Sequence, residues 1–299
     1  MVGNEQTVFA LLVALLAGGH ILLEGVPGPA KTLCVRLLAR LLEVDFRRIA
    51  FTPDLMPSDV VGTTVFDPRS ATFSLRRGPV FTNLLLADEI NRTPPKTQSA
   101  LLEAMEERQA TIDGEPQPLP GPFMVCATQN PIEFEGTYPL PEAQLDRFLV
   151  RSTTAYPSAV QERALIARAV SGFDARELEA AGVLSVASAA DVLAAQGEVR
   201  AVFLSESLQA YLYAIVAATR EAADVALGAS PRAALALVRA AQAAAAIDAR
   251  AFATPDDIKR VAPLVLEHRL IVRPEAELEG VDARAIVRRI VAAVPVPRE

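Results

Sequence analysis

The segment from His20 to Thr32 reads His-Ile-Leu-Leu-Glu-Gly-Val-Pro-Gly-Pro-Ala-Lys-Thr, which are the residue types of a phosphate-binding loop. It predicts a strand, a glycine-punctuated loop and a helix that begins at Leu33. Backbone N–H groups of such a loop and helix start form an electropositive cradle for phosphates. Lys31 would reach the β- and γ-phosphates of a nucleotide, and the Thr32 hydroxyl would hold Mg²⁺. The predicted phosphate-binding residues are Gly25, Gly28, Pro29, Ala30, Lys31, Thr32 and Leu33.

Two acids end the apolar run Leu84-Leu-Leu-Ala-Asp-Glu89. Adjacent carboxylates at the end of a buried strand are costly to desolvate unless a cation compensates them. Asp88 would help to hold Mg²⁺, and Glu89 would orient or deprotonate an attacking water. The alternative is an ordinary strand end that reaches solvent, which the phosphate loop earlier in the chain disfavours.

Three further polar residues could act on a transferring phosphoryl group. Asn130 follows the apolar run Phe123–Thr128 and could position the lytic water, although Asn-Pro can simply start a turn. Arg147 precedes the last predicted strand, and a cation there could stabilise the transition state from a neighbouring subunit. A surface ion pair is the alternative for Arg147, and Arg92 and Arg151 are other candidates for the same role.

Arg232 lies at the start of an alanine-rich helix, in the sequence Gly228-Ala-Ser-Pro-Arg232. Ser230 suits the N-cap and Pro231 the first helical position. A cation in the first turn opposes the helix dipole, so a functional reason is expected. Contact with the γ-phosphate would couple the second domain's orientation to the nucleotide state.

Short apolar runs alternate with helical patterns in the first half of the chain, which indicates a parallel sheet covered by helices. We expect these strands to be buried on both faces. After Tyr156 the strands end and alanine-rich helices take over, so we predict domains at residues 1–156 and 157–299. The expected strands are His20–Glu24, Phe46–Phe51, Leu84–Ala87, Phe123–Thr128 and Phe148–Arg151, and the expected helices of this half are 5–16, Leu33–Glu43 and Thr97–Arg108.

Two hairpins are predicted within the first domain. One joins Thr63–Phe66 to Ala71–Leu75 through Asp-Pro-Arg-Ser, and the other turns at Asp113-Gly114. The return arm of the second carries three prolines, which restrict it to an exposed edge. Both hairpins could also be decorative loops.

Composition excludes several classes of protein. The 299 residues carry a net charge of −7, which argues against a broad nucleic-acid footprint. Cys34 and Cys126 lie in apolar contexts and are expected to be buried, with neither a disulfide nor a metal between them. The uncharged run from Thr7 to Leu23 is interrupted by Gly18-Gly19 and is too short for a membrane span, so we expect a cytoplasmic protein.

The phosphate loop, the paired acids, the segments around Asn130 and Arg147, and the start of the alanine-rich helix at Gly228–Arg232 all carry one resemblance. Together they resemble the MoxR family of AAA+ ATPases over nearly the whole chain. The resemblance implies an α/β fold with a P-loop AAA+ core, a parallel five-stranded sheet covered by helices, and a smaller all-helical lid domain. It implies ATP and Mg²⁺ as cofactors, Lys31 and Thr32 as Walker A, Asp88 and Glu89 as Walker B, and Asn130 as sensor 1. It implies Arg147 as the finger that acts in trans and Arg232 as sensor 2. Ala30 is a usual variation in this family, and Val2 and Gly3 resemble the segment that lines the adenine pocket.

The resemblance further implies ATP hydrolysis in a ring, usually a hexamer, with chaperone-like remodelling of a protein client. Partners with a von Willebrand factor A-type domain are common in the family, and in relatives the two hairpins face a central pore. Two alternatives stay open: a DNA-directed motor, for which Arg69, Arg76 and Arg77 are the nearby basic residues, and a nucleotide switch that does not hydrolyse ATP.

Overall fold

The computed structural model describes residues 4–25, 30–130, 136–154, 156, 158–171 and 182–297. Within this part of the chain, no helix has both the length and the apolar character that crossing a membrane requires. The chain forms two compact units, one of Met1–Leu11, His20–Leu140 and Ser152–Leu193, the other of Leu12–Gly19, Pro141–Arg151 and Ala194–Glu299. The predicted domain boundary at residue 156 stays a prediction.

The first unit is built on a five-stranded sheet in the order β2-β5-β8-β1-β9, and the pairs β2–β5, β5–β8 and β8–β1 are parallel. This confirms the predicted α/β core with its five strands. Its central strands are buried apolar runs, as parallel strands covered on both faces should be. The strands are β1 (Ile21–Gly25), β2 (Phe46–Ala50), β5 (Leu84–Asp88), β8 (Met124–Gln129) and β9 (Val150–Thr154).

β2 departs from the expected pattern, because only Ile49 of its five residues is buried. It lies at the edge of the sheet, so Arg47 and Arg48 can reach solvent. The last strand also begins later than predicted. It was expected to start at Phe148, but Phe148 lies in a turn and β9 starts at Val150.

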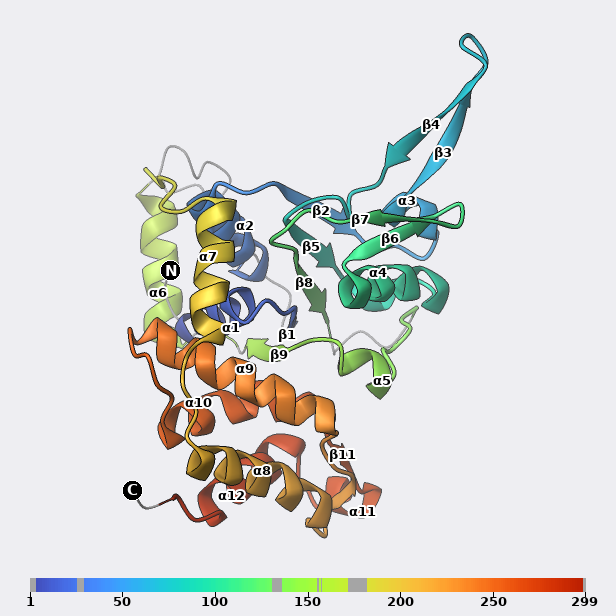
Figure 1. Cartoon of the computed structure of the whole chain (residues 1–299). Helices are drawn as coiled ribbons and strands as arrows, with labels where there is room; N and C mark the ends of the chain where they lie inside the picture. The colour runs from blue at the N-terminus through green and yellow to red at the C-terminus, as the bar shows by residue number, and fades with distance from the viewer. Residues whose placement is uncertain are drawn as a thin grey trace. The chain divides into compact units, whose positions relative to one another are not determined.

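Helices connect these strands (Figure 1). The helix after the phosphate loop begins at Ala30, three residues before the predicted start. The helices up to residue 200, of which α5 belongs to the second unit, are α1 (Glu5–Leu16), α2 (Ala30–Leu42), α3 (Pro57–Val61), η1 (Ile90–Arg92), α4 (Pro95–Glu107), α5 (Glu142–Leu145), α6 (Ala159–Val170) and α7 (Ala189–Arg200).

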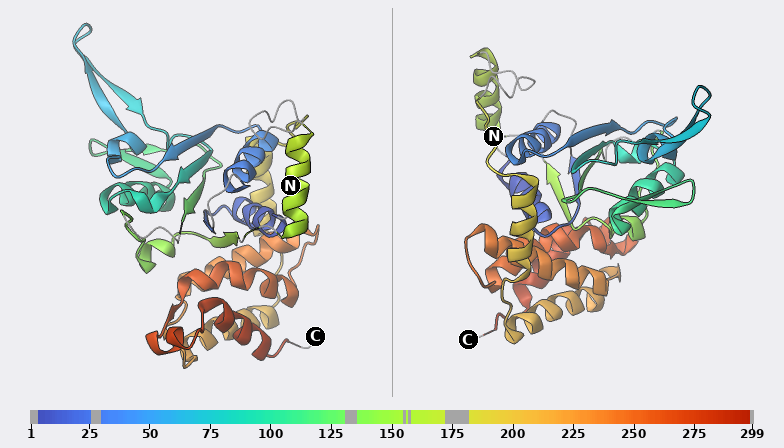
Figure 2. Two further views of the ribbon diagram at one scale, coloured as in Figure 1. Left: turned by 180° about the vertical axis from the view of Figure 1, so that it is seen from behind. Right: turned by 45° about the horizontal axis from the view of Figure 1, so that its top comes forward.

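Both predicted hairpins form. β3 (Gly62–Asp67) pairs with β4 (Thr72–Arg77), and β6 (Gln109–Ile112) pairs with β7 (Glu115–Pro118). The second turns at Asp113 and Gly114, both with positive φ, as a tight hairpin requires. The β3–β4 ribbon projects away from the sheet in each view (Figures 1 and 2).

Helices dominate the second unit, where α9 packs against α10 and most of the alanines of α9 are buried. The lid was expected to be all helical, but β-branched residues at 225, 271 and 272 also form a short antiparallel pair, β10 with β11. The elements after α7 are α8 (Glu206–Glu221), β10 (Val225–Leu227), α9 (Pro231–Ile247), α10 (Pro255–Leu266), η2 (Glu267–Arg269), β11 (Ile271–Val272), α11 (Pro274–Leu278) and α12 (Ala283–Ala293).

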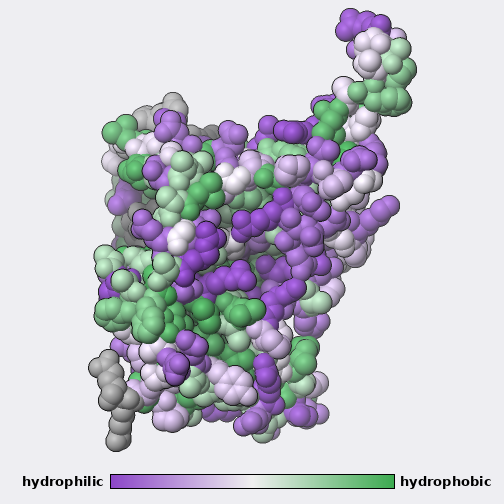
Figure 3. Space-filling view, viewed as in Figure 1, coloured by the Kyte–Doolittle hydropathy of each residue, from purple (hydrophilic) through white to green (hydrophobic). Residues whose placement is uncertain are grey.

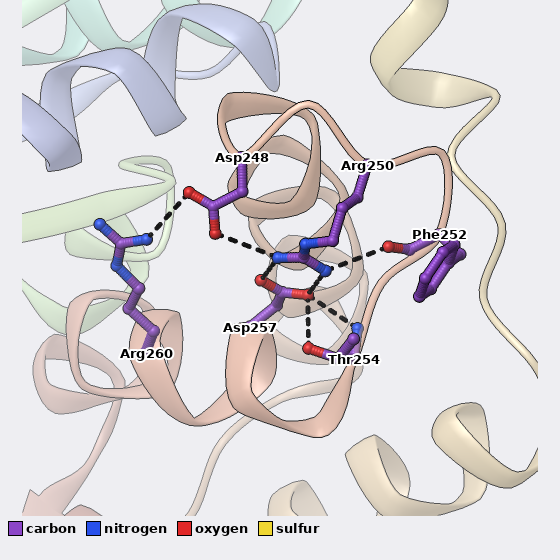
Figure 4. A network of polar contacts seen from close by, with 6 residues as sticks. All are labelled: Asp248, Arg250, Phe252, Thr254, Asp257 and Arg260. Atoms are coloured by element: carbon purple, nitrogen blue, oxygen red, sulfur yellow. Dashed lines mark hydrogen bonds and ion pairs between the residues drawn. The ribbon is translucent and has the colours of Figure 1, made fainter.

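A polar network ties the end of α9 to the start of α10 (Figure 4). Arg250 forms a bidentate pair with Asp257, with N···O distances of 2.7 and 2.5 Å, and also contacts Asp248 at 3.1 Å. The same Asp257 carboxylate accepts the backbone N–H and the hydroxyl proton of Thr254. It therefore closes the N-terminal cap of α10.

Candidate functional site

β1 ends at Gly25, where the chain turns into the phosphate loop. Gly25 has a φ of +131°, and a Cβ there would lie 2.1 Å from the carbonyl oxygen of Thr154. Glycine is therefore required at this position for both space and backbone conformation. The carbonyl oxygen of Gly25 accepts a hydrogen bond of 2.8 Å from Lys31 Nζ.

Lys31, Thr32 and Leu33 lie in the first turn of α2, because the helix begins at Ala30. Backbone N–H groups in a first turn have no partner within the helix and lie at its positive end. Lys31 is only 8% exposed. Burial lowers the pKa of its ammonium group, and the carboxylates of Asp88, Glu24 and Glu89 oppose that shift.

Asp88 ends β5 with both carboxylate oxygens engaged. Its Oδ1 accepts the hydroxyl proton of Thr128 at 2.6 Å, and its Oδ2 accepts from Arg48 Nε at 3.1 Å and Nη2 at 2.5 Å. Arg48 comes from β2 and Thr128 from β8, the two strands that flank β5. The sequence arguments missed both residues, although arginine inside a predicted strand and threonine before Gln-Asn were visible signals.

Glu89 adopts φ 58° and ψ 49°, the left-handed region that residues other than glycine seldom occupy. Its backbone N–H donates to Thr128 Oγ1 at 2.9 Å, and its carboxylate pairs with Arg92 Nε at 2.9 Å. Such a conformation persists only where its surroundings impose it. The side chain is 44% exposed, so water can reach the carboxylate.

The Thr32 hydroxyl and the Asp88 carboxylate suit Mg²⁺ better than they suit a metal that is bound by protein ligands alone. Among the described residues, no group of three or more His, Cys, Asp or Glu could hold a metal ion. Mg²⁺ usually keeps several waters and takes one or two carboxylates together with substrate phosphates. The Thr32 hydroxyl and the Asp88 carboxylate are donors of that kind.

Comparisons with known proteins agree with this geometry. The ATPase family associated with various cellular activities (AAA) matches residues 20–150, and the AAA lid domain matches residues 217–290. The chain is 43% identical to Chaperone MoxR1 of Mycobacterium tuberculosis, over 100% of this chain and 80% of that protein. The chain belongs to the MoxR family of AAA+ ATPases.

Two further relatives and one solved structure are similar to this chain over nearly its whole length. The chain is 49% identical to the uncharacterized protein YeaC of Bacillus subtilis, over 99% of this chain and 91% of that protein. It is 30% identical to Protein MoxR of Paracoccus denitrificans, over 99% of this chain and 93% of that protein. The crystal structure of a candidate ATPase from Cytophaga hutchinsonii superposes with a TM-score of 0.90 at 45% identity, over 100% of this chain and 92% of that one.

The first unit of this MoxR-family chain brings Lys31, Asp88 and Glu89 together at the carboxyl edge of its sheet. Asn130 follows β8 at the same edge and is 7% exposed. Four predicted residues, Val2, Gly3, Gly28 and Pro29, lie outside the described residues.

Arg147 and Arg232 belong to the second unit. Arg147 lies in the turn after α5, and Arg232 is the second residue of α9, whose N-cap is Ser230 as predicted. The neighbouring Asp146 carboxylate pairs with Arg269 at 2.6 Å and accepts from Ser230 Oγ at 3.3 Å.

Proposed function

We propose that this chain hydrolyses ATP to ADP and phosphate. The observation that carries the proposal is the buried Lys31 ammonium in the field of Asp88 and Glu89, at the edge where β1, β5 and β8 end. A cation at the mouth of a phosphate loop beside two carboxylates suits a magnesium nucleotide. Lys31 would contact the β- and γ-phosphates through its ammonium group, while Thr32 and Asp88 would hold Mg²⁺.

Glu89 is the proposed general base. A water attacks the γ-phosphorus, the bond from that phosphorus to the β,γ-bridging oxygen breaks, and Glu89 takes the proton of the water. Mg²⁺ would neutralise charge on the phosphate oxygens. Asn130 would orient the water through its side-chain amide, and the contact with Thr128 holds the Glu89 backbone in the conformation that this role needs.

Ring assembly is the second part of the proposal. Arg147 would stabilise the transition state in a neighbouring subunit, where such a cation contributes about 10³–10⁵ in rate. Arg232 would contact the γ-phosphate of its own subunit. The family suggests an oligomer, and we propose a hexamer located in the cytoplasm.

A protein client is favoured over DNA by the β3–β4 ribbon. Phe66 and Phe73 are cross-strand neighbours whose ring centroids lie 5.1 Å apart, and Leu75 lies on the same face. These side chains are 49%, 73% and 39% exposed. Figure 3 shows the apolar surface of the ribbon below its hydrophilic turn. An apolar face suits unfolded protein or a protein partner, such as a von Willebrand factor A-type domain, better than a phosphate backbone.

ATP turnover per subunit, measured across a wide range of protein concentration with Arg147→Ala alongside, tests this function. We expect a rate that rises with concentration and is lost in the variant. A flat, detectable rate that Arg147→Ala leaves unchanged would exclude the trans-acting finger. No turnover at any concentration would contradict hydrolysis by the chain alone and favour the switch.

A further inference from the structure

Arg269 holds the turn that carries Arg147. Its side chain is 3% exposed, and its five N–H donors all have acceptors. Nε donates to Asp146 Oδ1 at 2.6 Å, and Nη2 donates to the carbonyl oxygens of Asp146 at 3.1 Å and Phe148 at 2.7 Å. Nη1 donates to the carbonyl oxygens of Leu149, at 3.1 Å, and Val265. The backbone on both sides of Arg147 is therefore attached to η2.

His268 adds a second attachment to the same turn. Its Nε2 lies 3.0 Å from the carbonyl oxygen of Phe148, so this nitrogen carries the proton and donates. Burial, together with the charges of Arg269 and Arg151, lowers the pKa of His268, which keeps the ring neutral. Phe148 is fully buried. The turn is therefore joined to η2 through both Arg269 and His268.

Asp146 links this turn to the helix that carries Arg232. Its Oδ2 accepts a hydrogen bond from Ser230 Oγ at 3.3 Å, and the same Ser230 oxygen accepts from Ala233 N as the N-cap of α9. Burial and, to a smaller extent, the charge of Arg232 lower the pKa of Arg269, while Asp146 opposes the shift. Arg232 therefore lies within electrostatic reach of the cluster.

We propose that Asp146 and Arg269 are positioning residues that couple Arg232 to Arg147 within one subunit. The inference rests on the proposed function, in which Arg232 contacts its own nucleotide and Arg147 acts on the next one. A displacement at the start of α9 passes through Ser230 and Asp146 to Arg147. The nucleotide state of one subunit thereby sets the finger that it presents to its neighbour.

Ser230→Ala breaks this link without touching either arginine. Because it also removes an N-cap, a matched control is needed, and Ser205→Ala provides one. Ser205 caps α8 in the same unit, and its Oγ accepts from Leu208 N at 3.3 Å, the same distance as in the Ser230 cap. Comparable thermal unfolding of the two variants would show that their structural costs match.

The test dopes wild-type assemblies with Glu89→Gln subunits, which are expected to retain ATP without hydrolysing it. Total ATP turnover is measured as the fraction of doped subunits rises at constant total protein, and independent subunits would give linear dilution. Three dopants are compared: Glu89→Gln alone, Glu89→Gln with Ser230→Ala, and Glu89→Gln with Ser205→Ala. We expect at least a twofold departure from linear dilution for the first and third dopants. The Ser230→Ala dopant should return the curve to linear dilution.

Identical curves for the Ser230→Ala and Ser205→Ala dopants would overturn the coupling while leaving ATP hydrolysis intact. Linear dilution with all three dopants would overturn it in the same way. Absence of turnover in undoped wild-type protein would instead overturn the proposed function, and the inference with it.

Discussion

Thr128 and Asp88 are joined by a hydrogen bond of 2.6 Å, in which the threonine hydroxyl donates to the carboxylate. The same threonine oxygen, Oγ1, accepts a hydrogen bond from the backbone N–H of Glu89 at 2.9 Å. One side chain from β8 therefore orients both the proposed magnesium ligand, which is the last residue of β5, and the proposed general base, which follows it directly. This arrangement explains how Glu89 can keep its left-handed backbone conformation.

Thr128→Val should lower ATP turnover, because valine keeps the shape of threonine but can neither donate to Asp88 nor accept from Glu89. Loss of a residue that orients a metal ligand typically costs about 10–100-fold in activity, and we expect a fall of that order in kcat. Steady-state kinetics at saturating Mg²⁺ measures it.

Thr82→Val is the matched control for Thr128→Val. Thr82 is fully buried and donates to the carbonyl oxygen of Asp45 at 2.8 Å, near the start of β5. The Thr82→Val variant should therefore be less stable than the parent but should keep its rate of ATP turnover. Equal losses of kcat in the two variants would contradict an orienting role for Thr128.

Lys31→Ala and Glu89→Gln should separate binding from hydrolysis. In the proposed function Lys31 supplies the buried cation for the phosphates, so its removal should abolish ATP binding. Glu89→Gln removes only the proposed proton acceptor, so binding should persist and the proposed assembly should stay in its ATP-bound form. Equilibrium binding of a fluorescent ATP analogue and sizing with ATP measure both effects. Equal loss of binding in the two variants would contradict the assigned roles.

The sequence was sufficient to predict the sheet strands and the polar residues at their ends. The positions of Lys31, Asp88 and Glu89 after their strands could be predicted because glycine punctuation and paired acids after apolar runs are local signals. Their mutual proximity followed from the parallel sheet, in which the carboxyl ends of the strands share one edge.

Arg48 and Arg269 could not be assigned from the sequence, because their partners lie 40 and 123 residues away along the chain. The expectation that β2 is buried was wrong for the same reason: strand order, which places β2 at the edge, is not a local property. Arg269 sits in a short segment after α10, and nothing in its neighbours indicates that it binds the turn around Arg147.

Arg250→Ala should lower the free energy of unfolding of the second unit. Asp257 is 3% exposed, and without Arg250 it keeps only its bonds from Thr254 (Figure 4). Breaking a buried ion pair by removing one partner costs about 3–5 kcal/mol, and we expect roughly 2–3 because Arg250 is partly solvated. Urea unfolding followed by circular dichroism measures the change.

Arg260→Ala is the control for Arg250→Ala. Arg260 pairs with Asp248 at 3.6 Å, and both side chains are nearly half exposed. Surface pairs contribute about 0–1 kcal/mol, so the loss should stay within that range. A cost for Arg250→Ala no larger than that for Arg260→Ala would show that the network does not hold the cap of α10.

His20 should make the stability of the first unit depend on pH. The ring is buried, its Nδ1 accepts from Val125 N at 2.9 Å, and its Nε2 donates to the carbonyl oxygen of Met105 at 3.1 Å. Burial lowers the pKa of His20 from 6.5 to about 4. The unfolded chain therefore binds the proton first as pH falls, so stability is full above about pH 6.5 and decreases toward pH 4.

The linkage relation gives a loss of about 2 kcal/mol between pH 7 and pH 5 from His20 alone. His20→Gln offers an acceptor for Val125 and a donor for Met105 but does not titrate, so it should lose about 2 kcal/mol less than the parent over this range. Urea unfolding of both proteins at the two pH values measures the difference. Because His268 remains in both proteins, its own contribution cancels, and parallel losses would show that His20 accepts a proton without disturbing the fold.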